Sequence, residues 1–285
     1  MRNLKRIRPG YAWMVAGGLA CLLTACNGDA KDAAARLDKA QGFYEAGDFF
    51  SARNEIDSVR NLYPKEIDAL RRGLELMRQV DLKEAERNLA YCDSLLPVRM
   101  EEAEKLKKGF VLEKDTVYQE IGNYVWKQQT IERNVQRCYV RCGVDERGEM
   151  YLASVFYGAH PIKHTGIRLS IKGDLFAETP AIPYDGGLNY RFEDMGNTTE
   201  VVTYKGEAGR EAIQFIYDHA TDRIRTEYTG GKPYIIYIAD ADKQALVATY
   251  NLATALSDIE RMKTEKEKAE KKIAYLHEKL AAKSE

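Results

Sequence analysis

The chain has 285 residues, with 43 Lys and Arg against 44 Asp and Glu, so its formal net charge is −1. A nearly neutral chain without a block of basic residues excludes nucleic acid as an expected partner. Hydrophobic residues make up 45%, which is normal for a globular protein. Beyond the first 25 residues no apolar stretch approaches 18 residues, so no membrane-spanning helix is expected there.

The N-terminus begins with basic residues and continues with an apolar stretch from Tyr11 to Leu23. That stretch is typical of a signal sequence and is short for a bilayer span. It ends in Leu22-Leu23-Thr24-Ala25-Cys26, which resembles a bacterial lipobox, where a cysteine thiol is diacylated before signal cleavage. The resemblance implies that residues 1–25 are a lipoprotein signal peptide and that Cys26 carries the lipid.

A polar segment follows the lipid cysteine, and residues 26–32 are interpreted as a lipidated tether. The chain as a whole resembles lipoproteins of the Bacteroidetes. The residue after Cys26 is Asn27 and not Asp, which by resemblance to known lipoprotein sorting favours the outer membrane over the inner one. We therefore expect a lipid-anchored envelope protein, and the sequence leaves open whether it faces the periplasm or the cell surface.

An internal spacing of 33 residues relates Ala52 to Ala85 and Pro64 to Pro97. The first unit has a turn at Gly47-Asp48, and its proline is placed to end a helix. This pattern resembles tetratricopeptide repeats. The resemblance predicts helical repeats over residues 33–109. It also predicts a second hairpin that turns near Val80 and a separate capping helix over 98–109.

The resemblance also implies a binding groove lined by the first helix of each repeat. The groove residues predicted to contact a peptide or a partner helix are Gln41, Tyr44, Glu45, Leu74, Met77 and Arg78, with Leu37 and Leu70 beside them. In the alternative interpretation, the leucines and Met77 are buried beneath the helix over 98–109.

Residues 110–239 are rich in Tyr, Val, Ile and Thr and predict an antiparallel, sandwich-like β domain. The turn at 145–148 joins two strands into a hairpin. One inserted helix is predicted over 208–220. The predicted strands are 110–112, 124–130, 135–144, 150–157, 167–171, 190–192, 200–204, 224–228 and 234–238. Together with the helical regions, this gives an α+β fold class.

Residues 240–285 predict one long helix, which Asp240 or Asp242 can cap. Its second half has apolar residues at 3–4 spacing with Lys266 at one inward position, which is typical of a coiled-coil seam. The seam consists of Ile259, Met262, Lys266, Ala269, Ile273, Leu276 and Leu280. Three interpretations stay open: weak self-association through residues 259–282, a coiled coil within the chain, and a solvated helix.

The search for chemistry finds no catalytic motif, so no catalytic residue, no metal site and no cofactor are predicted. His160 and His164 are the nearest to a metal pair but lack a third ligand. Cys92, Cys138 and Cys142 are interpreted as small buried hydrophobes. Cys138 and Cys142, about 13 Å apart on one strand, are too distant to bond.

Tyrosine is unusually frequent, with 18 Tyr against 8 Phe. Such residues suit half-buried strand positions, but exposed rings also stack on sugars. The tyrosines and the tryptophan considered are Tyr118, Tyr124, Trp126, Tyr139, Tyr151, Tyr157, Tyr184 and Tyr190. The function expected from the sequence is a non-enzymatic lipoprotein that binds a protein partner through its helical repeats. The alternatives are a glycan-binding lipoprotein and, third, an enzyme of unknown type.

Overall fold

A computed structural model describes residues 25–115 and 117–281, and it describes side chains from Gly28 onward. The signal peptide predicted over 1–25 lies outside the described residues except for its last residue, and the side chain of Cys26 lies outside them too. The described residues divide into two compact units, one reaching to Leu89 and including the residues from Lys268, the other covering Ala90–Glu267.

The first unit begins with a helical hairpin of α1 (Ala25–Glu45) and α2 (Phe49–Leu62). The predicted turn is present, because Gly47 has φ +75° and Asp48 caps α2 by accepting from the Ser51 backbone N–H. Ala40 and Ala52 are fully buried in the cluster that joins the two helices. This confirms the first predicted hairpin. Since α1 already includes residues 26–32, the predicted tether is helical.

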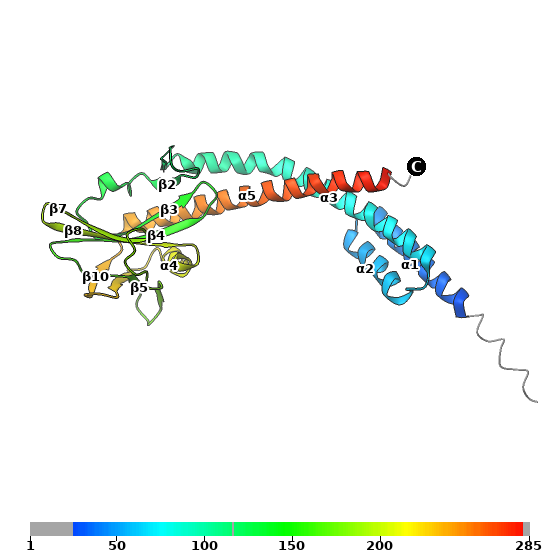
Figure 1. Ribbon diagram of the computed structural model, residues 1–285, viewed down its shortest axis with the longest axis horizontal. Coiled ribbons are helices and arrows are strands. Elements are labelled where there is room, and N and C mark those ends of the chain that lie inside the picture. The colour runs from blue at the N-terminus through cyan, green and yellow to red at the C-terminus, as the bar shows by residue number, and fades with distance from the viewer. Residues whose placement is uncertain (1–24, 116, 282–285) are drawn as a thin grey trace, which may run out of the picture. The chain divides into compact units, whose positions relative to one another are not determined.

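The second predicted hairpin is absent, and this part of the repeat prediction is wrong. Residues from Ile67 to Lys107 form one continuous helix, α3, which passes through both Val80 and Pro97 (Figure 1). Val80 is fully buried in the core of the first unit, and no glycine is available there to turn the chain. Pro97 is accommodated inside the helix despite its missing N–H. Residues 98–109 therefore form no separate capping helix.

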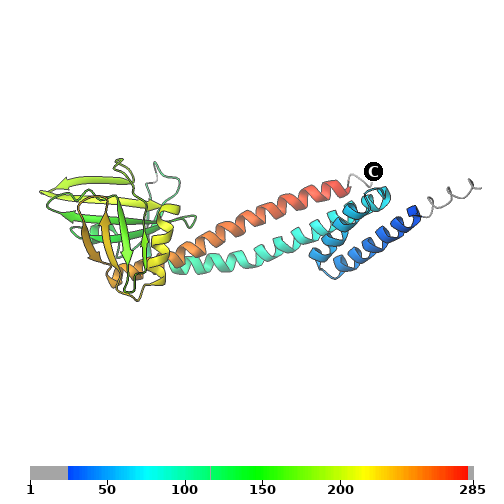
Figure 2. The same ribbon diagram turned by 90° about the horizontal axis from the view of Figure 1, so that it is seen from below.

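The second unit contains every described strand, arranged in two antiparallel sheets (Figures 1 and 2). The six-stranded sheet has the order β1-β2-β3-β4-β8-β7, and the four-stranded sheet has the order β10-β9-β5-β6. The strands are β1 (Phe110–Glu113), β2 (Asn123–Trp126), β3 (Tyr139–Asp145), β4 (Met150–Gly158), β5 (Gly166–Ser170), β6 (Phe176–Glu178), β7 (Asn189–Asp194), β8 (Asn197–Lys205), β9 (Arg225–Thr229) and β10 (Tyr234–Tyr237).

One apolar core joins the two sheets with helix α4 (Glu207–Asp218) and the start of α5 (Asp240–Ala281). Its contributors alternate along each strand, as residues on one face of a sheet must. Leu152 and Phe156 of β4, Leu169 of β5 and Ile216 of α4 are representative. The predicted strands and the inserted helix are present here, but the strand predicted over 124–130 ends at Trp126 and the one predicted over 135–144 begins at Tyr139. The short strand β6 and a 3₁₀ turn, η1 (Ile131–Arg133), were not predicted.

The long C-terminal helix is confirmed as α5. In the second unit its seam packs on α3 of the same chain, because Leu256 and Ile259 share a cluster with Ala103. Lys266 reaches Asp93 of α3 at 2.5 Å, so the inward lysine is paired. In the first unit Lys272 similarly pairs with Asp81 of α3 at 3.0 Å. This charge pairing explains how a polar residue is accommodated in the seam.

Candidate functional site

A hollow of about 560 Å³ lies over one face of the six-stranded sheet. The opposite face of the same sheet covers the apolar core. The wall of the hollow also includes η1 and the segment that leads into β3. The wall residues on the strands fall at alternate positions: Tyr139 and Arg141 on β3, Tyr151, Ala153, Val155 and Tyr157 on β4, Tyr190, Phe192 and Asp194 on β7, and Thr199, Val201, Thr203 and Lys205 on β8.

The hollow forms because small side chains occupy the middle of this face and large rings surround them. Across the two central strands, Ala153 is opposite Thr203 and Val155 is opposite Val201. One row is closed at its ends by Tyr139, opposite Val155, and by Tyr190, opposite Val201. Directly opposite residues of antiparallel strands point to the same face. The strand register therefore places a short aliphatic floor inside a ring of aromatic walls.

Gly143 provides the space that one of these aromatic side chains, Tyr151, occupies. It lies opposite Tyr151, and a Cβ at Gly143 would come within 2.5 Å of the Tyr151 ring. The ring therefore lies directly against the glycine backbone, where no other residue type leaves room. Burial raises the pKa of Tyr151 to about 12, so its hydroxyl stays neutral.

Arg141 is a cation in the wall whose donors are only partly used. One of its terminal nitrogens, Nη2, donates to both carboxylate oxygens of Glu113, at 2.9 and 2.8 Å. Its Nε is buried and has no acceptor among the described residues. Burial lowers the pKa of the guanidinium, but Tyr151 and Glu113 raise it more, so the pKa lies above its ordinary value. Arg141 is therefore a fixed positive charge.

Arg137 is a second cation, and both of its terminal nitrogens have partners. It donates to Asn134 Oδ1 at 2.7 Å, forms an ion pair with Asp242 and lies 4.7 Å from the centroid of the Tyr139 ring. Asp242 is buried, and Gln129 also donates to it. Burial raises the pKa of Asp242, and the bonds from Gln129 and Arg137 offset only part of that rise. Arg137 and Asp242 therefore attach the hollow to the first turn of α5.

Lys205 is the third cation, and it differs from the two arginines. It is exposed at the end of β8, opposite Tyr151, and it makes no ion pair with any described residue. The acidic residue in the wall, Asp194, lies at the far end of β7, opposite Asn197. One end of the hollow therefore has an uncompensated positive charge.

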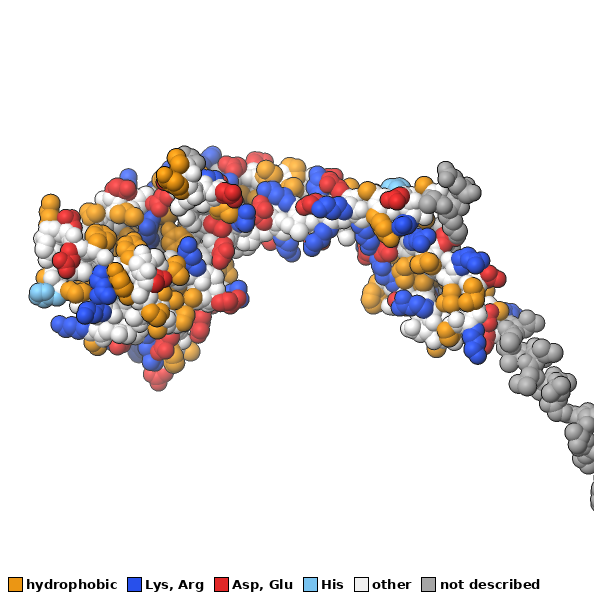
Figure 3. All heavy atoms as spheres, viewed as in Figure 1, with side chains coloured by type: hydrophobic (Ala, Val, Ile, Leu, Met, Phe, Trp, Pro, Cys, Tyr) orange, Lys and Arg blue, Asp and Glu red, His pale blue; other side chains and the backbone are white. Residues whose placement is uncertain are grey.

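The other end of the hollow has an apolar rim. Figure 3 shows hydrophobic side chains gathered between charged ones on the visible face of the β-rich unit. Four rim residues are strongly exposed: Ile131 at 53%, Val135 at 65%, Phe192 at 51% and Met195 at 91%. Met195 and Gly196 form the two-residue turn between β7 and β8 with φ of +48° and +79°. A left-handed conformation is unfavourable for methionine, since it suits Gly, Asn or Asp.

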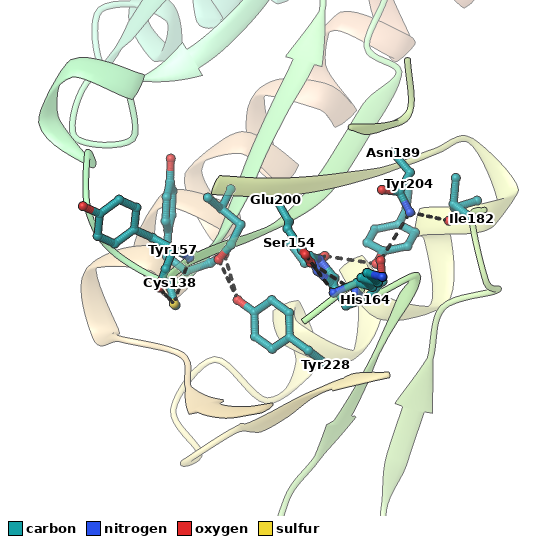
Figure 4. A network of polar contacts seen from close by, with 12 residues as sticks. Cys138, Ser154, Tyr157, His164, Ile182, Asn189, Glu200, Tyr204 and Tyr228 are labelled. Carbon is teal, nitrogen blue, oxygen red and sulfur yellow. Dashed lines mark hydrogen bonds and ion pairs between the residues drawn. The ribbon is translucent and has the colours of Figure 1, made fainter. Parts of the chain in front are cut away.

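A second cluster of functional groups lies in the core behind the sheet (Figure 4). His164 Nδ1 is 2.8 Å from Glu200 Oε2, and its Nε2 is 2.9 Å from Ser154 Oγ. Because a carboxylate only accepts, Nδ1 donates to Glu200, and in the neutral tautomer Nε2 accepts from the Ser154 hydroxyl. Tyr204 then donates its hydroxyl to Ser154, at 3.0 Å.

The order serine, histidine and carboxylate is that of a hydrolytic triad, but the burial is wrong for catalysis. Ser154, His164 and Glu200 are all buried, and Ser154 is 0% exposed, so no substrate reaches its hydroxyl. Glu200 also accepts from the backbone N–H groups of Lys163 and His164. Burial raises the pKa of Glu200, but these bonds lower it more, so the pKa lies below its ordinary value. The cluster connects β4, β8 and the segment before β5.

The six predicted groove residues lie in the first unit and are not brought together as two repeats would place them. Tyr44 and Met77 pack against the core of that unit, and Leu37 is part of it. Gln41 donates to Glu45 at 2.9 Å, and both side chains lie on α1. Leu74, at 55% exposure, remains accessible on α3, and Arg78 is partly buried.

Cys92, Cys138 and Cys142 are free thiols. Cys92 and Cys142 are buried, and Cys138 is half-buried. Burial raises the pKa of the Cys142 thiol to about 12, so it is not a reactive thiolate. Of the two histidines considered for a metal, His164 belongs to the buried network and His160 is exposed. Within residues 25–115 and 117–281 no cluster of three or more His, Cys, Asp or Glu is placed to hold a metal ion.

The sequence of β3 contains a local signal for the hollow. Arg137, Tyr139 and Arg141 alternate with Cys138 and Val140, which marks an outer face of β3 that combines rings and cations. Four of the tyrosines considered for sugar stacking, Tyr139, Tyr151, Tyr157 and Tyr190, line the hollow. The sequence could not show that they surround one cavity, because that depends on the pairing of distant strands.

Comparison with protein-family models, curated proteins and solved structures finds no match for this chain. Among the helices of the described region, none combines the length and the apolar content needed to cross a bilayer. The function is therefore argued from the site alone.

Proposed function

We propose that this protein is a non-enzymatic, membrane-anchored binding lipoprotein of the bacterial envelope that holds a small ligand in the hollow of its β-rich unit. The lipobox-like run ending at Cys26 supports the anchor, and Asn27 after it favours the outer membrane. The single observation that carries the binding function is the hollow of about 560 Å³ with its aromatic walls. Volumes of 300–1,000 Å³ with mostly apolar walls and a few polar groups are typical of ligand sites.

The proposal of a non-enzymatic role rests on how the reactive groups are placed. The one triad-like arrangement described here has its serine enclosed in the core. Tyr151 and Cys142 are held neutral by burial, so neither is poised for acid–base or nucleophilic work near neutral pH. What faces the hollow is suited to contact and charge recognition.

The test uses a soluble form, residues 27–285, which retains every described side chain. It is incubated with fractionated lipids, glycans and peptides from a bacterial envelope and then examined by native mass spectrometry. Thr203→Trp, on the floor of the hollow, should abolish the ligand adduct by filling the space. Thr254→Trp, in a different surface hollow beside α4 and α5, is the matched control and should retain it. An adduct that survives Thr203→Trp, or no adduct with any fraction, would contradict the proposal.

A second candidate function is recruitment of a protein partner by the helical unit, the role that the sequence favoured first. The observation that supports it is the exposure of Leu74 beside half-buried Met77 and Tyr44. Exposed leucine on a helix is common, so this surface needs direct evidence. Envelope crosslinking followed by mass spectrometry, repeated with Leu74→Asp, tests it: a crosslinked partner that Leu74→Asp removes would support this role, and an unchanged crosslinking pattern would contradict it.

A further inference from the structure

We propose that the ligand of the hollow is a long-chain carboxylate, with its alkyl chain on the floor and its head group beside Lys205. This inference rests on the proposed function, because it names the chemistry that the same hollow recognises. Three features carry it: the floor, the rim and the distribution of charge.

The floor offers few hydrogen-bonding groups to a polar ligand. Ala153, Val155 and Val201 present only methyl groups to the hollow, Thr203 adds one hydroxyl, and Ala153 and Val155 are largely buried even without a ligand. A sugar placed there would lose water from most of its hydroxyls without replacement, which costs free energy for each unpaired group. An alkyl chain has no hydrogen bonds to water to lose, and its transfer from water to the floor is favourable.

Four rings around the floor, those of Tyr139, Tyr151, Tyr190 and Phe192, are not free stacking platforms for a sugar. Arg137 lies over the Tyr139 ring, and Tyr190 stacks with Phe192 at 6.5 Å and 15°. The Tyr151 ring lies against Gly143. These rings are therefore placed as fixed apolar walls, which favours a ligand that fills the space between them.

The rim continues the apolar surface outward. Ile131, Val135, Phe192 and Met195 are all more than half exposed and lie in the wall of the same hollow. Exposed apolar groups gathered at one mouth are typical of a site that buries apolar ligand surface. Retaining Met195 in a left-handed turn is consistent with a contact role for its side chain, since Asn or Gly would be less strained there.

The positive charge without an ion-pair partner lies at the opposite end from the rim. Lys205 and Arg141 lie at the Tyr151 end, and Lys205 has no ion pair among the described residues. The positive charge of Arg141 is already paired with Glu113, so Lys205 is the cation available to pair with an anionic ligand. From Lys205 to Thr199 the wall follows seven residues of β8, and the six steps between them span about 20 Å at the usual rise. A polar head and an extended alkyl chain match that arrangement in both length and order.

The experiment measures binding of octanoate, decanoate and dodecanoate to residues 27–285 by calorimetry at pH 8, below micelle formation. Burial of each methylene should tighten binding about fourfold. Dodecyl maltoside, which has the same chain and a neutral head, should bind at least about fivefold more weakly than dodecanoate. Dodecyl phosphate tests the head group, and maltohexaose tests a sugar without a chain.

Two variants locate the ligand. Lys205→Gln should weaken the binding of dodecanoate about five- to tenfold and leave the binding of dodecyl maltoside unchanged. Lys172→Gln, an exposed lysine between β5 and β6, is the control and should change neither. Thr203→Trp should abolish binding of both alkyl ligands.

The outcomes separate this inference from the proposed function. Binding that does not depend on chain length, tighter binding of dodecyl phosphate, or no effect of Lys205→Gln would overturn the long-chain carboxylate. Maltohexaose binding that Thr203→Trp abolishes would overturn it too, yet would leave the hollow as the ligand site. Dodecanoate binding that Thr203→Trp does not affect would overturn both.

Discussion

The two faces of the six-stranded sheet use the same strands for opposite purposes. On β4, Leu152, Ser154 and Phe156 face the core, whereas Tyr151 and Ala153 face the hollow. The inward face is filled, and its polar groups satisfy one another through His164 and Glu200. The outward face leaves space, an exposed apolar rim and a lysine without an ion-pair partner. Stability is concentrated on the first face and recognition on the second, so substitutions on the two faces should differ in kind.

The largest expected effect is on the inward face. Glu200→Ala would leave the His164 ring and two backbone N–H groups buried without their acceptor. Breaking a buried, hydrogen-bonded pair in this way costs about 3–5 kcal/mol of unfolding free energy. Urea unfolding at pH 7 measures it. Glu178→Gln, which removes an exposed pairing with Arg168, is the control and should cost less than about 1 kcal/mol. Similar losses for both would argue against a structural role for the network.

The second prediction concerns pH. The folded-state pKa of Glu200 is lowered, so its ionised form stabilises the fold above the unfolded pKa of about 4.3. That contribution is lost as the pH falls through the lower, folded-state pKa. The difference in unfolding free energy between wild type and Glu200→Gln should be constant from pH 7 to about 5 and should shrink in more acidic solution. If the difference in unfolding free energy instead grew as the pH falls, the pKa of Glu200 would be raised in the folded state and not lowered, which would contradict this prediction.

The third prediction addresses the boundary between stability and recognition. Gly143→Ala would push a methyl group into the Tyr151 ring and should cost about 1–3 kcal/mol through overpacking. Since the ring forms a wall of the hollow, ligand affinity should fall as well. Thermal unfolding and calorimetry on the same sample measure both effects. Gly173→Ala, in an open turn with φ +101°, is a control in which only backbone strain is added. Loss of stability with unchanged ligand affinity would show that the Tyr151 ring is not part of the binding site.

The smallest expected effect on stability belongs to the outward face. Lys205→Gln should change the unfolding free energy by less than about 0.5 kcal/mol, because the side chain is exposed and makes no ion pair with a described residue. The same variant should weaken ligand binding severalfold. Urea unfolding is the check. A loss of unfolding free energy above about 1 kcal/mol would show that Lys205 stabilises the fold. It would contradict the assignment of the outward face to recognition alone.

Most strands could be predicted from the sequence because alternation is a local property. The hairpin of β3 and β4 is marked by its turn at 145–148, and the long helix α5 by its continuous periodicity. The second helical hairpin was predicted wrongly because residue spacing was given more weight than turn chemistry. Pro97 repeats the position of Pro64, but nothing near Val80 replaces the glycine at 47.

The candidate site could not be predicted in the same way. The hollow depends on which residues of β3, β4, β7 and β8 are opposite one another, and β7 and β8 follow β4 only after a long intervening segment. The network of Ser154, His164 and Glu200 likewise joins residues that are far apart in sequence. Residue types at single positions indicated rings and cations, but only the register of the sheet places them around one space.

The most direct test of the central claim is a crystal structure of residues 27–285 grown with dodecanoate. The account predicts an alkyl chain over Val155 and Val201, between the rings of Tyr139 and Tyr190, with the carboxylate beside Lys205. Dodecanoate bound with its head group toward Met195, or bound only in the hollow beside α4 and α5, would contradict the assignment of the outward face as the binding site.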